Sequence, residues 1–136
     1  MFRHTSFGLA FALALAGACL ATAHAHVIAN PAEGTAGSYL QTAFTVSHGC
    51  EGSPTVALRI RIPEGVLSVK PQMKPGWVVN IKTRKLDAPI QGPHGTTLDE
   101  LVDEVEWRGG PLPDNLYDTF GLIVKLPDAP GKTLYF

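Results

Sequence analysis

Apolar and polar residues alternate along several short segments of the chain, and Gly- and Pro-rich segments separate them. The clearest alternation covers residues 55–62 (TVALRIRI), where every second residue is Val, Leu or Ile. A period of two is typical of a strand with one buried and one solvated face. Segments of the same kind are residues 39–46, 66–69, 77–83, 120–126 and 134–136. Short strands between turn residues predict an all-β domain, and an Ig-like or cupredoxin-like β-sandwich would bury the apolar faces of two sheets.

Residues 97–107 (TLDELVDEVEW) allow two interpretations. The apolar residues have helical spacing, and Thr97 with Glu100 forms a capping-box pattern, so the local signals favour a helix. In a strand, Leu101, Val105 and Trp107 would share one face, with Asp103 as the polar interruption.

The first 25 residues have the features of a secretory signal peptide. Arg3 precedes an apolar segment, residues 7–20, which is shorter than the roughly 20 apolar residues that span a membrane. Small residues at 23 and 25 predict cleavage after Ala25, so that residues 26–136 form the mature domain. Cleavage after Ala23 fits the same rule and would leave His24-Ala25-His26 at the terminus.

Composition narrows the possible partners of the 111 residues that remain after cleavage. Without Arg3 there are 10 Lys and Arg against 12 Asp and Glu, a formal net charge of −2. No basic patch is visible, so we expect no nucleic-acid partner. The length suits one domain with a modest core.

Cleavage before His26 would give one residue two metal ligands, the free α-amine and the ring Nδ1, which can chelate a metal in a six-membered ring. Nitrogen ligands in a planar arrangement favour Cu(II), which also heads the divalent affinity order. A terminal His24-Ala25-His26 would bind Cu(II) as well, through the amine, two backbone nitrogens and the third-position imidazole.

Copper oxygenases with an amino-terminal histidine use a second histidine, for which His48 and His94 are the candidates. Both precede a glycine in a predicted loop, and we interpret them as ordinary loop residues. A blue-copper site needs two histidines, a cysteine and usually a methionine, a set that the sequence does not suggest around Cys50. With no nucleophile–base pair and no phosphate loop in the sequence, we do not expect an enzyme.

A set of short motifs spread over residues 25–136 resembles the YcnI-like copper-binding domain family. These motifs include residues 25–27 (AHV), 36–39 (AGSY), 49–55 (GCEGSPT), 62–66 (IPEGV), 74–77 (KPGW), 106–107 (EW), 112–114 (LPD) and 120–122 (FGL).

The resemblance implies an exported bacterial β-sandwich that holds Cu(II) with a single-histidine brace. Carried over to this chain, the metal ligands are His26 and Glu51. The family places a tryptophan beside the metal, in a segment that would follow Phe136, and Trp77 and Trp107 match other, structural positions. The resemblance also favours a strand over residues 102–107.

The resulting hypothesis is a periplasmic or extracellular protein in copper delivery, homeostasis or resistance, with the copper ion and other periplasmic or membrane copper-handling proteins as its partners. The alternative is a structural or adhesive β-sandwich that binds no metal. An oxidative copper enzyme ranks third.

Cys50 is the one cysteine of residues 26–136, and an odd cysteine is unusual in an oxidising compartment. We expect the domain to continue beyond Phe136 and Cys50 to form a disulfide there. Such a disulfide stabilises a fold by about 2–4 kcal/mol, so the 136-residue chain should be less stable than the longer protein. Thiol titration of the unreduced longer protein tests this, and a titratable Cys50 would contradict it.

Overall fold

The structure is a computed structural model that describes residues 26–136. This part of the chain contains seven strands and one short 3-10 helix. The elements are β1 (Val27–Asn30), β2 (Tyr39–Val46), β3 (Thr55–Arg61), β4 (Val69–Pro71), β5 (Trp77–Gln91), η1 (Pro93–Gly95), β6 (Thr97–Leu112) and β7 (Asp118–Lys125). The predicted signal peptide, residues 1–25, lies outside the described residues.

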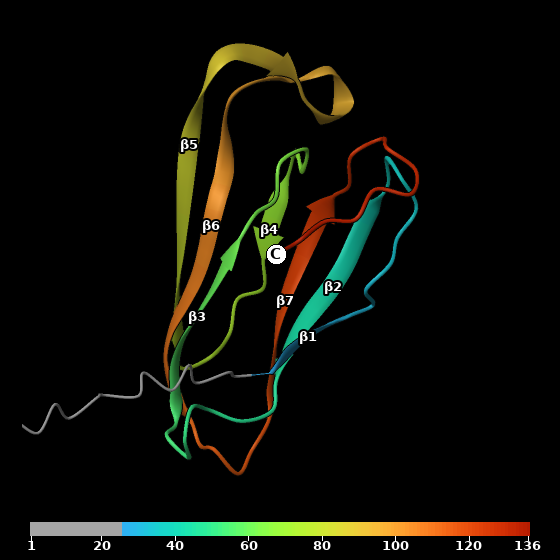
Figure 1. Cartoon of the computed structure of the whole chain (residues 1–136). Coiled ribbons are helices and arrows are strands. Elements are labelled where there is room, and N and C mark those ends of the chain that lie inside the picture. The colour runs from blue at the N-terminus through green and yellow to red at the C-terminus, as the bar shows by residue number, and fades with distance from the viewer. Residues whose placement is uncertain (1–25) are drawn as a thin grey trace, which may run out of the picture.

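The strands form two antiparallel sheets that face each other (Figure 1). One sheet has the order β1-β2-β7-β4, and the other has the order β3-β6-β5. This arrangement confirms the predicted all-β sandwich. Both β2 and β6 have a partner on each side, so these two strands are central to their sheets.

The core between the sheets is built around Trp107 of β6 and Phe120 of β7, both fully buried. Their rings pack edge to face with centroids 5.6 Å apart, and Trp77 packs on the other side of Phe120 at 5.0 Å. The Trp107 indole N–H donates to the Gln72 carbonyl at 3.0 Å, so burial leaves no unpaired donor. Both tryptophans are structural, as the sequence indicated.

Residues 97–107 form a strand, and the helix favoured by local signals is wrong. β6 lies between β3 and β5, and only the extended form turns Leu101, Val105 and Trp107 together into the core. Burial of this face outweighs the local helix propensity, which differs between residues by only about 0.7 kcal/mol or less. The strand is longer than the predicted 102–107, because it pairs with β5 from Thr97 onward.

Two predicted inward residues are exposed. Val56 lies at a register shift between β3 and β6, which turns it out of the core. Ile81 lies on β5, an edge strand of its sheet, and is exposed. By contrast, the alternate residues Phe120, Leu122 and Val124 of β7, and Leu126 directly after it, are buried as predicted.

Two predicted strands differ from the structure. The segment 66–69 is a loop until Val69, where β4 begins, although Val66 is buried. The segment 134–136 is not a strand. Pro127 and Pro130 lack an N–H, and Lys132 N bonds to Ala129 O in a turn, so this part of the chain does not join a ladder.

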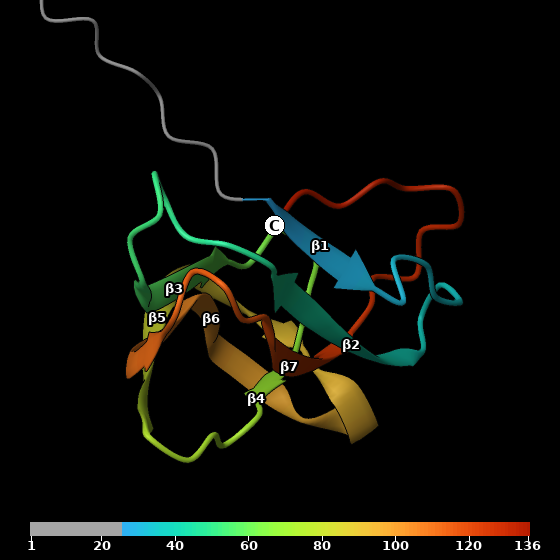
Figure 2. The ribbon, with the colours of Figure 1, turned by 90° about the horizontal axis from the view of Figure 1, so that it is seen from below.

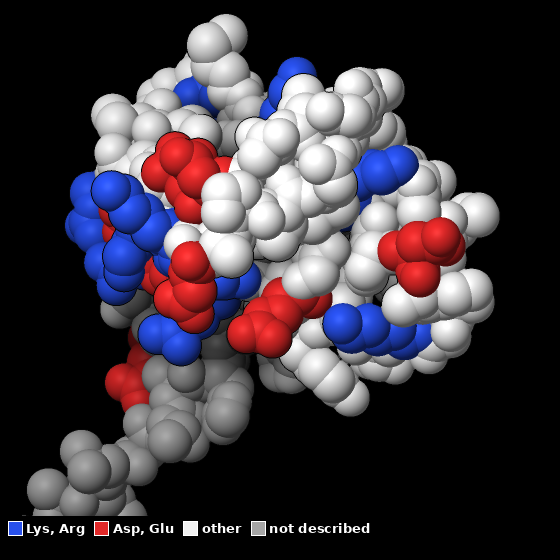
Figure 3. Space-filling view, turned by 90° about the horizontal axis from the view of Figure 1, so that it is seen from above, with Lys and Arg blue, Asp and Glu red and all other residues white. Residues whose placement is uncertain are grey.

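Charged side chains of both signs are interspersed on the face in Figure 3, around an uncharged area. Glu106 of β6 forms ion pairs with two arginines. Glu106 Oε1 accepts from Arg59 of β3 and from Arg108, each at 2.7 Å. These two hydrogen bonds lower the pKa of Glu106 from 4.5 to about 2. The hydrogen bond from Arg108 has the larger effect on this pKa.

The lowered pKa of Glu106 predicts a loss of stability in acid. Above pH 4.5 the carboxylate is ionised in both the folded and unfolded states, so its contribution is complete. As the pH falls from 4.5 to about 2, the unfolded chain binds the proton first, and the free energy of unfolding decreases. Glu106→Gln should lower stability at pH 7 and flatten this decrease. Urea denaturation at several pH values measures both effects.

The control is Glu104→Gln, since Glu104 is on the same strand and outside the four ion pairs found in residues 26–136. If both variants kept the pH profile of the parent protein, the interpretation of Glu106 would be wrong.

Candidate metal site at the start of the first strand

His26 lies immediately before β1 and is exposed. β1 was not predicted, and its pairing with β2 decides where His26 lies. Val27 is opposite Val46, the last residue of β2, so His26 is beside the beginning of the loop that follows β2. Figures 1 and 2 show this loop and the start of β1 at the same end of the sandwich.

The structure brings together His26 and His48. The distance between His26 Nδ1 and His48 Nε2 is 3.1 Å. The ring centroids are 5.3 Å apart and the ring planes are inclined by 62°. His48, which the sequence suggested was an ordinary loop residue, is therefore in direct contact with the predicted metal ligand.

The backbone around His48 is held by a neighbouring loop. Gly49 is buried, and its N–H donates to Asp114 Oδ1 at 2.8 Å. Asp114 belongs to the loop between β6 and β7, which lies at the same end of the sandwich in Figure 1. A hydrogen bond to a charged acceptor contributes about 1.5–3 kcal/mol, so this contact restrains the loop at His48. Nothing in the sequence pattern indicated a role for Asp114.

Glu51 is at the tip of the same loop and is exposed. Ser53 N donates to Cys50 O at 2.9 Å, and Glu51 and Gly52 have φ angles of 52° and 77°. Positive φ at both central residues is typical of a type I′ turn, in which Gly, Asn and Asp predominate. A glutamate in this left-handed region costs of order 1–3 kcal/mol, and such strain is frequent at functional sites.

The remaining predicted residues are separate from this pair. His94 lies in η1 at the tip of the β5–β6 hairpin, at the other end of the sandwich in Figure 1, and its ring stacks on Tyr39. Cys50 is an exposed thiol, so its disulfide stays a prediction. Within residues 26–136, no group of three or more His, Cys, Asp or Glu is placed to hold a metal. Glu51 thus does not form a ready three-ligand set with the two histidines.

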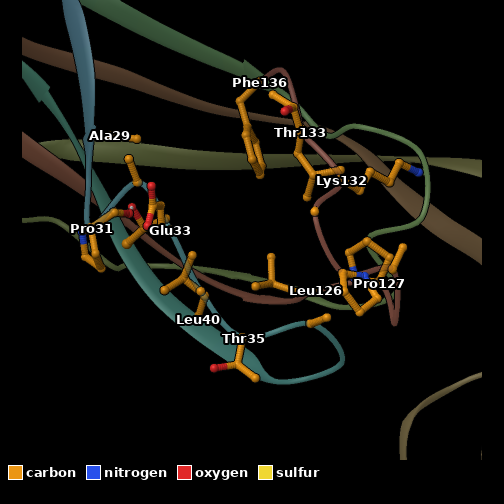
Figure 4. A pocket seen from close by; sticks show the side chains of 18 of the residues that line it. Ala29, Pro31, Glu33, Thr35, Leu40, Leu126, Pro127, Lys132, Thr133 and Phe136 are labelled. Carbon is orange, nitrogen blue, oxygen red and sulfur yellow. The ribbon is translucent and has the colours of Figure 1, made fainter.

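Away from the two histidines, a mostly apolar pocket has a volume of about 780 Å³ (Figure 4). It lies between the β1–β2 region and the chain after β7, with Leu40, Leu126 and Phe136 in its walls. Its charged lining residues are Glu33 and Lys132, and the Lys132 side chain points away from the centre in Figure 4. This pocket has an apolar lining and lacks a group of metal ligands.

The two facing sheets place the protein among the immunoglobulin-like β-sandwiches. A solved structure described as an uncharacterized protein from Nocardia farcinica with an immunoglobulin-like fold is similar, with a TM-score of 0.54 and 22% sequence identity. The match covers 78% of this chain and 69% of that one. None of the curated proteins matches the chain.

The chain belongs to the family described as "Domain of unknown function (DUF1775)", whose model matches residues 26–136. This is the YcnI-like family, so the resemblance read from the short motifs is confirmed. Within the matched residues, no helix is long and apolar enough to cross a membrane.

Gly49 should be essential for the position of His48. A Cβ atom at residue 49 would lie 1.8 Å from the Ser53 carbonyl oxygen, so Gly49→Ala must displace the loop. We expect lower thermal stability and loss of the contact between the His26 and His48 rings, measured by nuclear Overhauser effects.

Gly52→Ala is the matched control. A Cβ there has no neighbour within 4 Å, although the φ of +77° costs about 1–2 kcal/mol for a residue other than glycine. It should lower stability but keep the ring contact. A ring contact that survived Gly49→Ala would show that Gly49 does not fix His48.

Proposed function

We propose that this protein is an exported copper-binding protein whose mature chain begins at His26. In this proposal one Cu(II) is bound by the α-amine and Nδ1 of His26 and by the carboxylate of Glu51. The protein acts in copper delivery, homeostasis or resistance, in the periplasm or outside the cell. It carries copper as cargo, and the proposal includes no catalytic step.

The observation that carries the proposal is the place of His26 beside the loop of residues 47–54. His26 is exposed at the start of β1, and its Nδ1 faces that loop at 3.1 Å from His48 Nε2. Glu51 is on the same loop, three residues after His48. The available donors are imidazole nitrogen and carboxylate oxygen, and Cu(II) favours nitrogen and oxygen ligands in a tetragonal arrangement.

Two further observations support the proposal. The chain belongs to the YcnI-like family, for which the sequence resemblance implies this kind of site. Glu51 also occupies a left-handed turn position with φ of 52°, which turn chemistry alone would assign to Gly, Asn or Asp. A metal-binding role would explain why a glutamate stands there.

The proposal couples export to assembly of the site. While a residue precedes His26, the nitrogen of His26 is an amide and cannot act as an amine ligand. The mature protein should therefore bind Cu(II) more tightly than a version with one extra residue in front of His26. Isothermal titration and EPR spectroscopy on protein with a verified terminus measure this. Equal affinity and identical spectra in the two versions would contradict the brace.

Substitutions should separate the two proposed ligands. His26→Ala should nearly abolish tight binding, because it removes the imidazole of the chelate. Glu51→Gln should weaken binding less and change the equatorial ligands seen by EPR, since the amide is a poorer ligand than the carboxylate. Glu33→Gln is a matched control, because Glu33 is an exposed carboxylate of the apolar pocket. A Glu51→Gln protein with unaltered spectra would remove Glu51 from the site.

A further inference from the structure

The position of His48 is determined by strand pairing, and its ring faces His26. Because Val27 and Val46 are partners in the β1–β2 ladder, the chain on either side of this pair leads directly to the two histidines. Val46 is 1% exposed, so the end of β2 is anchored in the core two residues before His48. The 3.1 Å contact between Nδ1 of His26 and Nε2 of His48 thus follows from the strand pairing and from the buried end of β2.

The hydrogen bonding of His48 leaves its Nε2 available as a ligand. His48 Nδ1 is 2.9 Å from the carbonyl oxygen of Gly49. A carbonyl oxygen can only accept, so Nδ1 carries the hydrogen. In the neutral ring the lone pair is then on Nε2, the atom that faces His26. A ring N–H donated to a backbone carbonyl is the usual outer contact of a metal-binding histidine, since it fixes the tautomer and the ring orientation.

The spacing of the two ring nitrogens also suits a shared metal ion. With metal–nitrogen bonds of about 2.0 Å, two neighbouring ligands of a square-planar ion are roughly 2.8 Å apart. The observed 3.1 Å is close to that separation. His26 is exposed and His48 is half-buried, so an ion can reach the pair from solvent while one ligand stays fixed.

We propose that His48 is a ligand of the copper site, so that Cu(II) is held by three nitrogens: the α-amine and Nδ1 of His26 and Nε2 of His48. This inference rests on the proposed copper binding at His26 and changes its ligand set from one imidazole to two. Glu51, on the same loop, would supply the fourth equatorial ligand only after moving toward the two histidines, because the three residues are not grouped within residues 26–136. The anchored loop, through Gly49 N–H and Asp114, holds the second imidazole in place before the metal arrives.

The test compares the mature protein with His48→Ala and with His94→Ala, all with a verified His26 terminus. His94 is the matched control, because it is an exposed histidine at the other end of the sandwich. Pulsed EPR counts the imidazoles bound to Cu(II), and isothermal titration with copper salt gives the affinity. We expect two imidazoles in the mature protein and in His94→Ala, and one in His48→Ala.

The affinity of His48→Ala for Cu(II) should fall by about 10–100-fold or more. Removal of a residue that only hydrogen-bonds to a metal ligand already costs that much, and removal of a ligand itself should cost at least the same. Thermal unfolding of metal-free His48→Ala separates loss of a ligand from loss of the fold. An unchanged imidazole count and affinity in His48→Ala would overturn the role of His48 and leave the single-histidine brace intact.

A measurement without copper tests the premise separately. Nitrogen NMR of the metal-free protein should show the neutral form of the His48 ring with its hydrogen on Nδ1 and a bare Nε2, and the opposite tautomer would overturn the inference. The version with an extra residue in front of His26 distinguishes the two proposals. If it bound copper as tightly as the mature protein, yet lost affinity on His48→Ala, the brace would fail while the role of His48 would stand.

Discussion

The pairing of β2 with β7 on one side and β1 on the other is the constraint on which the core and the candidate site both depend. Phe44 of β2 is opposite Phe120 of β7, and both are buried between the sheets. Slipping β2 by one residue would turn Phe44 and Val46 toward solvent. On the other side of β2, the register of β1, with Val27 opposite Val46, places His26 beside the loop that carries His48. Burial of the apolar face of β2 therefore fixes the position of this strand in the fold, and the β1–β2 register fixes where His26 lies against it.

The proposed site at His26 needs such support, because the first residues of a domain are poorly ordered unless they are tied down. Here the terminal strand is only four residues long, and mainly Ala29 contributes to the core. Its position comes from ladder hydrogen bonds to β2 more than from buried side chains. The second histidine is held differently, by the buried end of β2 and by the hydrogen bond from Gly49 to Asp114. Of the two proposed ligands, one is thus accessible and the other is held by the core, a combination that would allow entry of an ion without loss of geometry.

The sequence predicted strands wherever one face is clearly apolar, as in β2, β3 and β7, because alternation reports burial directly. It missed β1, which is too short to show alternation, and the second half of β5, an exposed hairpin arm in which polar and apolar residues do not alternate regularly. The helical spacing of residues 97–107 was misleading because the choice depends on β3 and β5, which are distant in sequence. His26 was found from the chemistry of a cleaved terminus. His48 was considered and interpreted as a loop residue, and Asp114 was not singled out, because only the unpredicted β1 brings His48 to His26 and only the folded loops bring Asp114 to Gly49.

The structure also bears on which cleavage would assemble the site. After cleavage at Ala25, the α-amine and the ring that faces His48 belong to the same residue, and the chelate can form without moving β1. After cleavage at Ala23, the amine would be two residues away, up to about 7 Å along an extended chain. Copper would then be held by backbone nitrogens that must first lose their protons, and the His26 ring would bind it without need of His48. Under the proposed copper binding, a ligand from the loop after β2 would therefore matter after a cut at Ala25 and not after a cut at Ala23.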